Sequence, residues 1–119
     1  MNHTDKFLLA SKCKNLIIKT NNILSNVPRC DYFYKDKLNN YTLALLDEIY
    51  LANESITELE TRLANINRNI AMIDFLLERF YLKHYFNDNQ VQKVCDILIE
   101  IKKMSNVWLK KRIEATDVN

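Results

Sequence analysis

An uninterrupted apolar stripe in the middle of the chain restricts its possible folds more than any other feature. The members alternate by three and four residues: Ile56, Leu59, Leu63, Ile66, Ile70, Ile73, Leu77 and Phe80. Because an α-helix turns once every 3.6 residues, this spacing places all of these side chains on one face. Ser55 and Glu58 match a capping box, in which both side chains bond to backbone N–H groups at a helix start. The stripe therefore predicts one long helix over residues 55–85.

Three further segments carry helical spacing, over residues 4–25, 31–52 and 88–113. Asp31 is a candidate N-cap for the second segment, and Asn87 with Gln90 forms a capping box before the fourth. The inward stripe of the fourth segment is Val91, Val94, Cys95, Leu98, Ile101, Met104 and Trp108. Short polar turns favour antiparallel neighbours. The sequence predicts an all-α protein, an up-down-up-down four-helix bundle that forms a single domain over residues 1–119.

Glycine is absent from the chain, and Pro28 is its only proline. Tight β-hairpins and the loops that cradle phosphate groups depend on glycine, so most β architectures and the Gly-rich nucleotide-binding enzymes are excluded. The sequence also lacks the common catalytic arrangements, namely a Ser/His/Asp set, a local Cys/His pair and paired carboxylates on an apolar background. We therefore expect a protein that binds macromolecules, not an enzyme, and we expect no cofactor.

The three cysteines, Cys13, Cys30 and Cys95, lie far apart and have no neighbouring histidine that would complete a zinc site. We expect reduced, packed thiols and no metal. The first residues do not follow a secretory signal pattern, and no apolar run approaches the ~18 residues that a membrane-spanning helix needs. These features predict a cytoplasmic protein without a membrane partner.

The antiparallel topology gathers basic residues into two clusters, although the formal net charge is only +2. One cluster lies where the last helix ends, and consists of Lys6, Lys12, Lys110, Lys111 and Arg112. The opposite end collects Arg29, Lys35, Lys37, Arg79, Lys83 and His84. Cations in the last turn of a helix also complement the helix dipole. The first cluster can therefore serve either this dipole or contact with RNA phosphates, and both interpretations stay open.

Two arginines of the central helix differ in their sequence neighbours. Arg62 follows Glu58 by four residues, which suits an ion pair within the helix, whereas Arg68 has no acidic residue four positions away in either direction. The aromatic run 32–34 could stack on bases, but such a cluster at a helix start is more often core or subunit interface. The candidate nucleic-acid-binding residues are Arg29, Arg68, Lys83, Lys110, Lys111 and Arg112.

A catalytic alternative rests on Arg79 and His84, which are separated by four residues. This spacing resembles the ribonuclease motif of HEPN domains, which are also helical bundles. That motif usually has a polar residue after the arginine, whereas Phe80 here belongs to the apolar stripe. A HEPN-like ribonuclease therefore remains an alternative, and it is the less favoured one.

Three segments together resemble the Avd family of accessory proteins from diversity-generating retroelements. They are Val27-Pro28-Arg29, the stretch from Asn69 to Leu77, and the stretch from Gln90 to Trp108 with Lys110 after it. The similarity extends from about Leu16 to Arg112. The family is related to four-helix-bundle proteins encoded in intervening sequences of 23S ribosomal RNA genes.

The resemblance implies a four-helix protomer that assembles into a ring-like homopentamer. Such a protein binds the reverse transcriptase of the element and its template RNA, or an RNA/DNA hybrid, and mutagenic copying then diversifies a target gene. Arg29, Lys110 and Arg112 match basic positions of the family, whereas Arg68, Lys83 and Lys111 are candidates from clustering alone. A bundle of the ribosomal intervening-sequence type, with no known activity, is the alternative within the same resemblance.

Overall fold

The computed structural model describes the backbone of residues 3–117 and the side chains of residues 8–116. Its helices are α1 (His3–Leu24), α2 (Tyr32–Glu54), α3 (Leu59–Leu82) and α4 (Asp88–Asp117), and a short 3-10 helix, η1 (Arg29–Asp31), precedes α2. The bundle measures 52 × 23 × 18 Å, so its two ends are far apart. The predicted four-helix bundle is confirmed.

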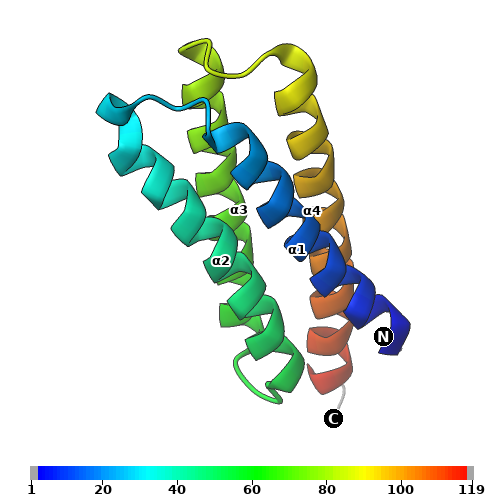
Figure 1. Cartoon of the computed structure of the whole chain (residues 1–119). Helices are drawn as coiled ribbons and strands as arrows, with labels where there is room; N and C mark the ends of the chain where they lie inside the picture. The colour runs from blue at the N-terminus through cyan, green and yellow to red at the C-terminus, as the bar shows by residue number, and fades with distance from the viewer. Residues whose placement is uncertain (1–2, 118–119) are drawn as a thin grey trace.

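The four helices alternate in direction, and each packs on the next along the chain, while α1 also packs on α4. Both termini lie at one end of the bundle, together with the α2–α3 connection (Figure 1). We call this the α4 end, because the last turns of α4 form it. The opposite end holds η1, the start of α2 and the α3–α4 connection, and we call it the η1 end (Figure 1).

The core consists of apolar side chains at the predicted helical spacings. Fully buried examples from the four helices are Leu16, Leu45, Ile73, Phe80 and Ile101, and each contributes about 1.5–3 kcal/mol by leaving water. Trp108 is also buried, as its place on the stripe predicts, whereas the equally buried Leu109 lies outside that stripe. Burial raises the pKa of the Cys13 thiol to about 12, which fits the expected packed thiol. Cys95 is half-buried and Cys30 is exposed, so the prediction of packed thiols was wrong for Cys30.

The start of α3 differs from the prediction. The Ser55 hydroxyl donates a hydrogen bond back to the Leu51 carbonyl at 2.7 Å, and Glu58 precedes α3 in the left-handed region, at φ 62°. Ile56 is 83% exposed, so the buried stripe begins one turn later, at Leu59. The capping box at Ser55 was wrong because the same hydroxyl can close the preceding helix by donating to its last carbonyl groups.

The end of α3 is a Schellman motif, which stops the helix before residue 85. His84 adopts φ 65°, its N–H donates to the Tyr81 carbonyl, and the Tyr85 N–H donates to the Phe80 carbonyl. The rings of Phe80 and Tyr85 pack with centroids 6.0 Å apart, which is the apolar contact that accompanies this motif. The next predicted cap is confirmed, because Asn87 and Gln90 exchange hydrogen bonds of 3.0 and 2.8 Å.

Candidate nucleic-acid interface

A buried carboxylate organises the η1 end. Asp31 is 4% exposed, and its side chain accepts hydrogen bonds from Lys83 at 2.9 Å, Tyr85 at 2.8 Å and Arg79 at 3.3 Å. Asp31 occupies the predicted N-cap position of α2, but it makes no side-chain hydrogen bond to the first turn, so the predicted capping bond was wrong. This carboxylate instead ties the chain before α2 to the end of α3.

The electrostatics of this cluster follow from those contacts. The pKa of Asp31 is lowered to about 2. The hydrogen bond from Lys83 is the largest cause of this shift, and the hydrogen bond from Tyr85 is the second. The hydrogen bond to Asp31 in turn raises the pKa of Tyr85 to about 12. Asp31 is therefore ionised across the physiological range, and its charge compensates two cations that lie one helical turn apart on α3.

Sequence reasoning missed this anion, although α3 contains a signal for it. Arg79 and Lys83 are four residues apart, and like charges at that spacing repel each other unless an anion lies between them. The signal shows that an acidic partner is needed, but it does not show which one. Asp31 is 48 residues away from Arg79 along the chain, and only the packing of α2 on α3 brings them together.

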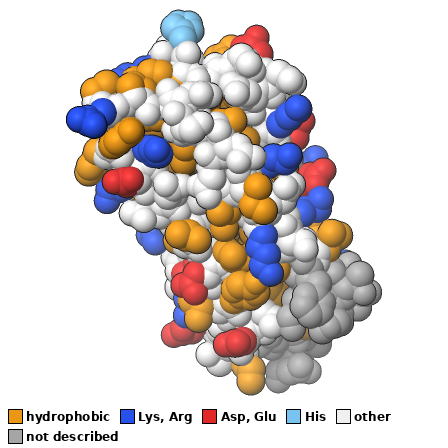
Figure 2. Space-filling view, viewed as in Figure 1, with side chains coloured by type: hydrophobic (Ala, Val, Ile, Leu, Met, Phe, Trp, Pro, Cys, Tyr) orange, Lys and Arg blue, Asp and Glu red, His pale blue; other side chains and the backbone are white. Residues whose placement is uncertain are grey.

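Two exposed aromatic rings and two lysines lie beside this cluster, at the start of α2, and the exposed carboxylate of Asp36 stands between the two lysines in the sequence. The Lys35 ammonium lies 4.8 Å from the centre of the Tyr32 ring, and the Lys37 ammonium lies 5.4 Å from the centre of the Phe33 ring. Figure 2 shows orange and blue side chains intermingled over this part of the molecule, at the upper left of the view. Arg29, in η1, is exposed, and its side chain forms no hydrogen bond or ion pair with the residues that the structure describes, although its carbonyl accepts a hydrogen bond from the Tyr32 N–H.

The other predicted cluster, at the α4 end, contains an arginine that is already bound. The Arg112 guanidinium donates to the Ala52 carbonyl at 2.6 Å and to the Ser55 carbonyl, which are the last backbone acceptors of α2 and its C-cap. It also lies 5.5 Å from the centre of the Trp108 ring. Burial lowers the pKa of Arg112. This side chain therefore closes α2, and we do not include it in a surface for RNA.

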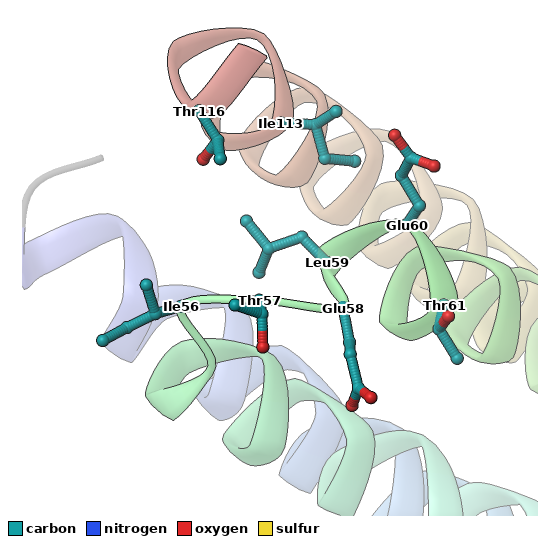
Figure 3. A pocket seen from close by; sticks show the side chains of 8 residues that line it. All are labelled: Ile56, Thr57, Glu58, Leu59, Glu60, Thr61, Ile113 and Thr116. Carbon is teal, nitrogen blue, oxygen red and sulfur yellow. The ribbon is translucent and has the colours of Figure 1, made fainter. Parts of the chain in front are cut away.

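Carboxylates surround the remaining cations of the α4 end. Lys110 and Lys111 are exposed, but Glu114 follows Lys110 by one turn. A hollow separates Ile113 and Thr116 of α4 from the α2–α3 connection, and Glu58 and Glu60 also line it (Figure 3). Lys12 forms an ion pair with Glu100, which precedes Lys110 by about 15 Å along α4, so the predicted place of Lys12 in this cluster was wrong. The side chain of Lys6 lies outside the described residues. The charge of this end is mixed.

Arg68 belongs to neither cluster. It is exposed in the middle of α3, and its guanidinium donates to the Asn65 side chain at 3.4 Å. With a rise of 1.5 Å per residue, it lies about 22 Å along the helix from Lys83. The structure thus brings Arg29 and Lys83 to the η1 end, leaves Lys110, Lys111 and Arg112 at the α4 end, and separates Arg68 from both.

Arg79 and His84, the two residues of the ribonuclease alternative, differ in backbone conformation. Arg79 lies within α3, where its guanidinium pairs with Asp31 and stacks on the Tyr34 ring at 3.8 Å. His84 lies beyond the helix in the left-handed position of the Schellman motif and is exposed. This geometry gives Arg79 a structural role and does not favour the ribonuclease alternative.

Among the described residues, the acidic, cysteine and histidine side chains do not form a group that could hold a metal ion. The described helices also do not include one that is long and apolar enough to cross a membrane. In comparisons with known proteins, no family model and no curated protein matches the chain.

Proposed function

We propose that this chain is a non-enzymatic accessory protein of a diversity-generating retroelement. In this role it binds the reverse transcriptase and the template RNA, or an RNA/DNA hybrid, and supports mutagenic cDNA synthesis. The resemblance to the Avd family motivates the role, and the four-helix bundle is the fold that this resemblance implies. The RNA half of the proposal rests on the charges of the η1 end.

The observation that carries RNA binding is the gathering of five cations from three elements at the η1 end. They are Arg29 from η1, Lys35 and Lys37 from α2, Arg79 from α3 and Lys83 from the C-cap of α3. Asp31 compensates the last two, so Arg29 and the α2 lysines are left to contact phosphates. Each phosphate that they neutralise releases counterions, which gives salt-dependent affinity without sequence preference.

A salt series of filter-binding measurements tests this surface. We expect the parent protein to bind single-stranded RNA with a logarithmic slope of about −0.7 per neutralised phosphate. The double variant Arg29→Gln/Lys37→Gln should flatten the slope by about 1.4, because two contacts are lost. The matched control at the other end, Lys110→Gln/Lys111→Gln, should leave the slope close to that of the parent.

Three outcomes would contradict parts of this proposal. A flatter slope in the lysine control alone would move the RNA surface to the α4 end. Cleavage of the bound RNA, lost on His84→Ala, would favour the ribonuclease alternative. Absence of binding even at low salt would remove RNA from the proposal and leave contact with the reverse transcriptase as its only form.

Self-association into a homopentamer is the remaining part of the proposal. Several large apolar side chains are exposed on the outer faces of α2 and α3, among them Leu43 (56%), Phe75 (54%) and Leu82 (65%). Contiguous exposed apolar surface often marks a protein interface. Light scattering at micromolar concentration should give the mass of five chains, and the mass of one chain would overturn this part.

A further inference from the structure

We propose that Tyr32 and Phe33 form a stacking platform for unpaired bases of single-stranded RNA, with Lys35 and Lys37 beside the path of the phosphates. This inference rests on the proposed RNA-binding function and names the form of RNA that the η1 end takes. It concerns the aromatic rings, which the electrostatic argument does not use.

The two rings are open to solvent in the chain as described. Tyr32 is 45% exposed and Phe33 is 64% exposed, although both belong to the first turn of α2. Exposed aromatic surface loses the favourable free energy of burial, so neighbouring exposed rings suggest a ligand that covers them. Every base offers a π-face of matching size, and stacking on aromatic side chains is a common way to hold single strands.

The charges around the rings select a polyanionic ligand. Lys35 and Lys37 lie over the rings of Tyr32 and Phe33, so a ligand that covers the rings also meets ammonium groups. A two-fold dimer through this patch would bring like charges together, because a two-fold interface places the patch against itself. A ring interface is heterologous, and the oligomer size measured below distinguishes it from RNA binding. A nucleic-acid strand supplies both the apolar faces and the negative charge.

The platform is held in place by the buried cluster behind it. The Phe33 ring packs edge-on against Tyr34, with centroids 5.2 Å apart, and the guanidinium of Arg79 lies 3.8 Å from the centre of the Tyr34 ring. Arg79 in turn pairs with Asp31. Because the Phe33 ring is supported before the ligand arrives, its ordering costs little further side-chain entropy on binding.

The same geometry distinguishes single strands from duplexes. Bases in a duplex are already stacked and paired, so their π-faces are closed, whereas unpaired bases can be splayed out onto protein side chains. Lysines contact the phosphates of both forms. We therefore expect the rings to contribute to the affinity for single strands and to contribute nothing to the affinity for duplexes.

The test uses the full chain and two RNA probes with nearly equal numbers of phosphates, a single strand of about 24 nucleotides and a blunt-ended duplex of about 12 base pairs without unpaired bases. The variant Tyr32→Leu/Phe33→Leu keeps the charges and the apolar side chains but removes the π-faces. Its affinity for the single strand should fall about 10- to 100-fold, and its affinity for the duplex should change less than about threefold. The control Tyr50→Leu removes a ring with nearly the same exposure, 44%, from the far part of α2 and should bind like the parent.

A second readout reports stacking directly. The fluorescence of a 2-aminopurine base in the single strand is quenched when the base stacks, so quenching should occur with the parent and disappear with the double variant. If the parent and the leucine variant bind the single strand with equal affinity, the proposed RNA-binding function stands and the platform is overturned. A smaller oligomer with unchanged RNA affinity would assign the rings to a subunit interface and also overturn it. If the parent binds neither probe, the proposed RNA function and the platform fail together.

Discussion

The two ends of the bundle each contain a cluster of basic side chains, but they use them differently. At the α4 end, Arg112 points inward and bonds to backbone carbonyl groups at the end of α2. At the η1 end the buried group is an anion, Asp31, which holds Arg79 and Lys83 close to the surface. The α4 end therefore uses Arg112 in the fold and leaves Lys110 and Lys111 exposed. The η1 end compensates Arg79 and Lys83 with its own anion and leaves Arg29 and Lys37 exposed.

The comparison shows why a count of charges does not locate a binding surface. Arginine carries five N–H donors in a rigid fork, so one arginine beside the orphan carbonyl groups of a helix end becomes a cap. Lysines on exposed turns have no such acceptors, and they remain available to a ligand. Whether each cation already has a partner within the fold, and not the number of cations, separates a structural cluster from a candidate interface.

The largest effect that we predict concerns Trp108, which is 6% exposed beside Arg112 at the α4 end. Trp108→Ala should lower the free energy of unfolding by about 3–5 kcal/mol, because it leaves a cavity and removes the ring near the guanidinium. Urea denaturation measures this loss. The neighbouring Val107 is 55% exposed, so Val107→Ala should stay within about 0.5 kcal/mol of the parent. Equal stability of both variants would show that α4 packs with another face inward.

A smaller loss should follow from Arg112→Gln, and it is the direct test of the comparison. The change removes hydrogen bonds to the Ala52 and Ser55 carbonyl groups, and a charged hydrogen bond to a partly buried acceptor is worth about 1.5–3 kcal/mol. Thermal unfolding should show this loss, whereas Arg29→Gln at the η1 end should stay within about 0.5 kcal/mol. If Arg112→Gln keeps its stability and loses RNA affinity, the roles of the two ends are the reverse of those we describe.

The sequence predicts the helices and most of the core, because both depend on a local period that one helix reveals by itself. Trp108 is an example, since its place on the stripe of α4 is enough to bury it. The same period places Ile56 on the stripe of α3. This prediction was wrong because α3 begins only at Leu59, so Ile56 lies in the connection before the helix. A hydroxyl that can close one helix or open the next is ambiguous in sequence.

The contacts of the candidate site could not be predicted in the same way. Asp31 and Arg112 both bond to partners on other helices, and the register between helices decides which partners those are. A charge pattern within one helix, such as Arg79 with Lys83, shows that a partner is needed without naming it. The gathering of cations at the η1 end could be predicted because it depends only on the antiparallel order of the helices. Short turns between the helices determine that order.

The next prediction concerns pH and the anion of the η1 end. The pKa of Asp31 is lowered from 3.8 to about 2, so its stabilising effect is complete above the unfolded value and is lost as the pH falls toward 2. Asp31→Asn should lower the thermal midpoint at pH 7, and the difference from the parent should narrow between about pH 4 and pH 2. Calorimetric scans across this range measure the narrowing. Asp36→Asn removes an exposed carboxylate five positions further along and should show no such trend.

The smallest effects should come from the two left-handed residues, one at each end of α3. His84 and Glu58 have φ values of 65° and 62°, where a Cβ atom is unfavourable and glycine is not. His84→Gly should raise the stability by about 0.5–1 kcal/mol, because the Schellman motif uses only its backbone. Glu58→Gly should raise it less, since the Glu58 carboxylate favours the positive N-terminus of α3 and lies 3.9 Å from Arg62. His84→Ala and Glu58→Ala keep the Cβ atom and should bring no gain in the same thermal scans, so a gain with alanine would point to the side chain and not to the backbone.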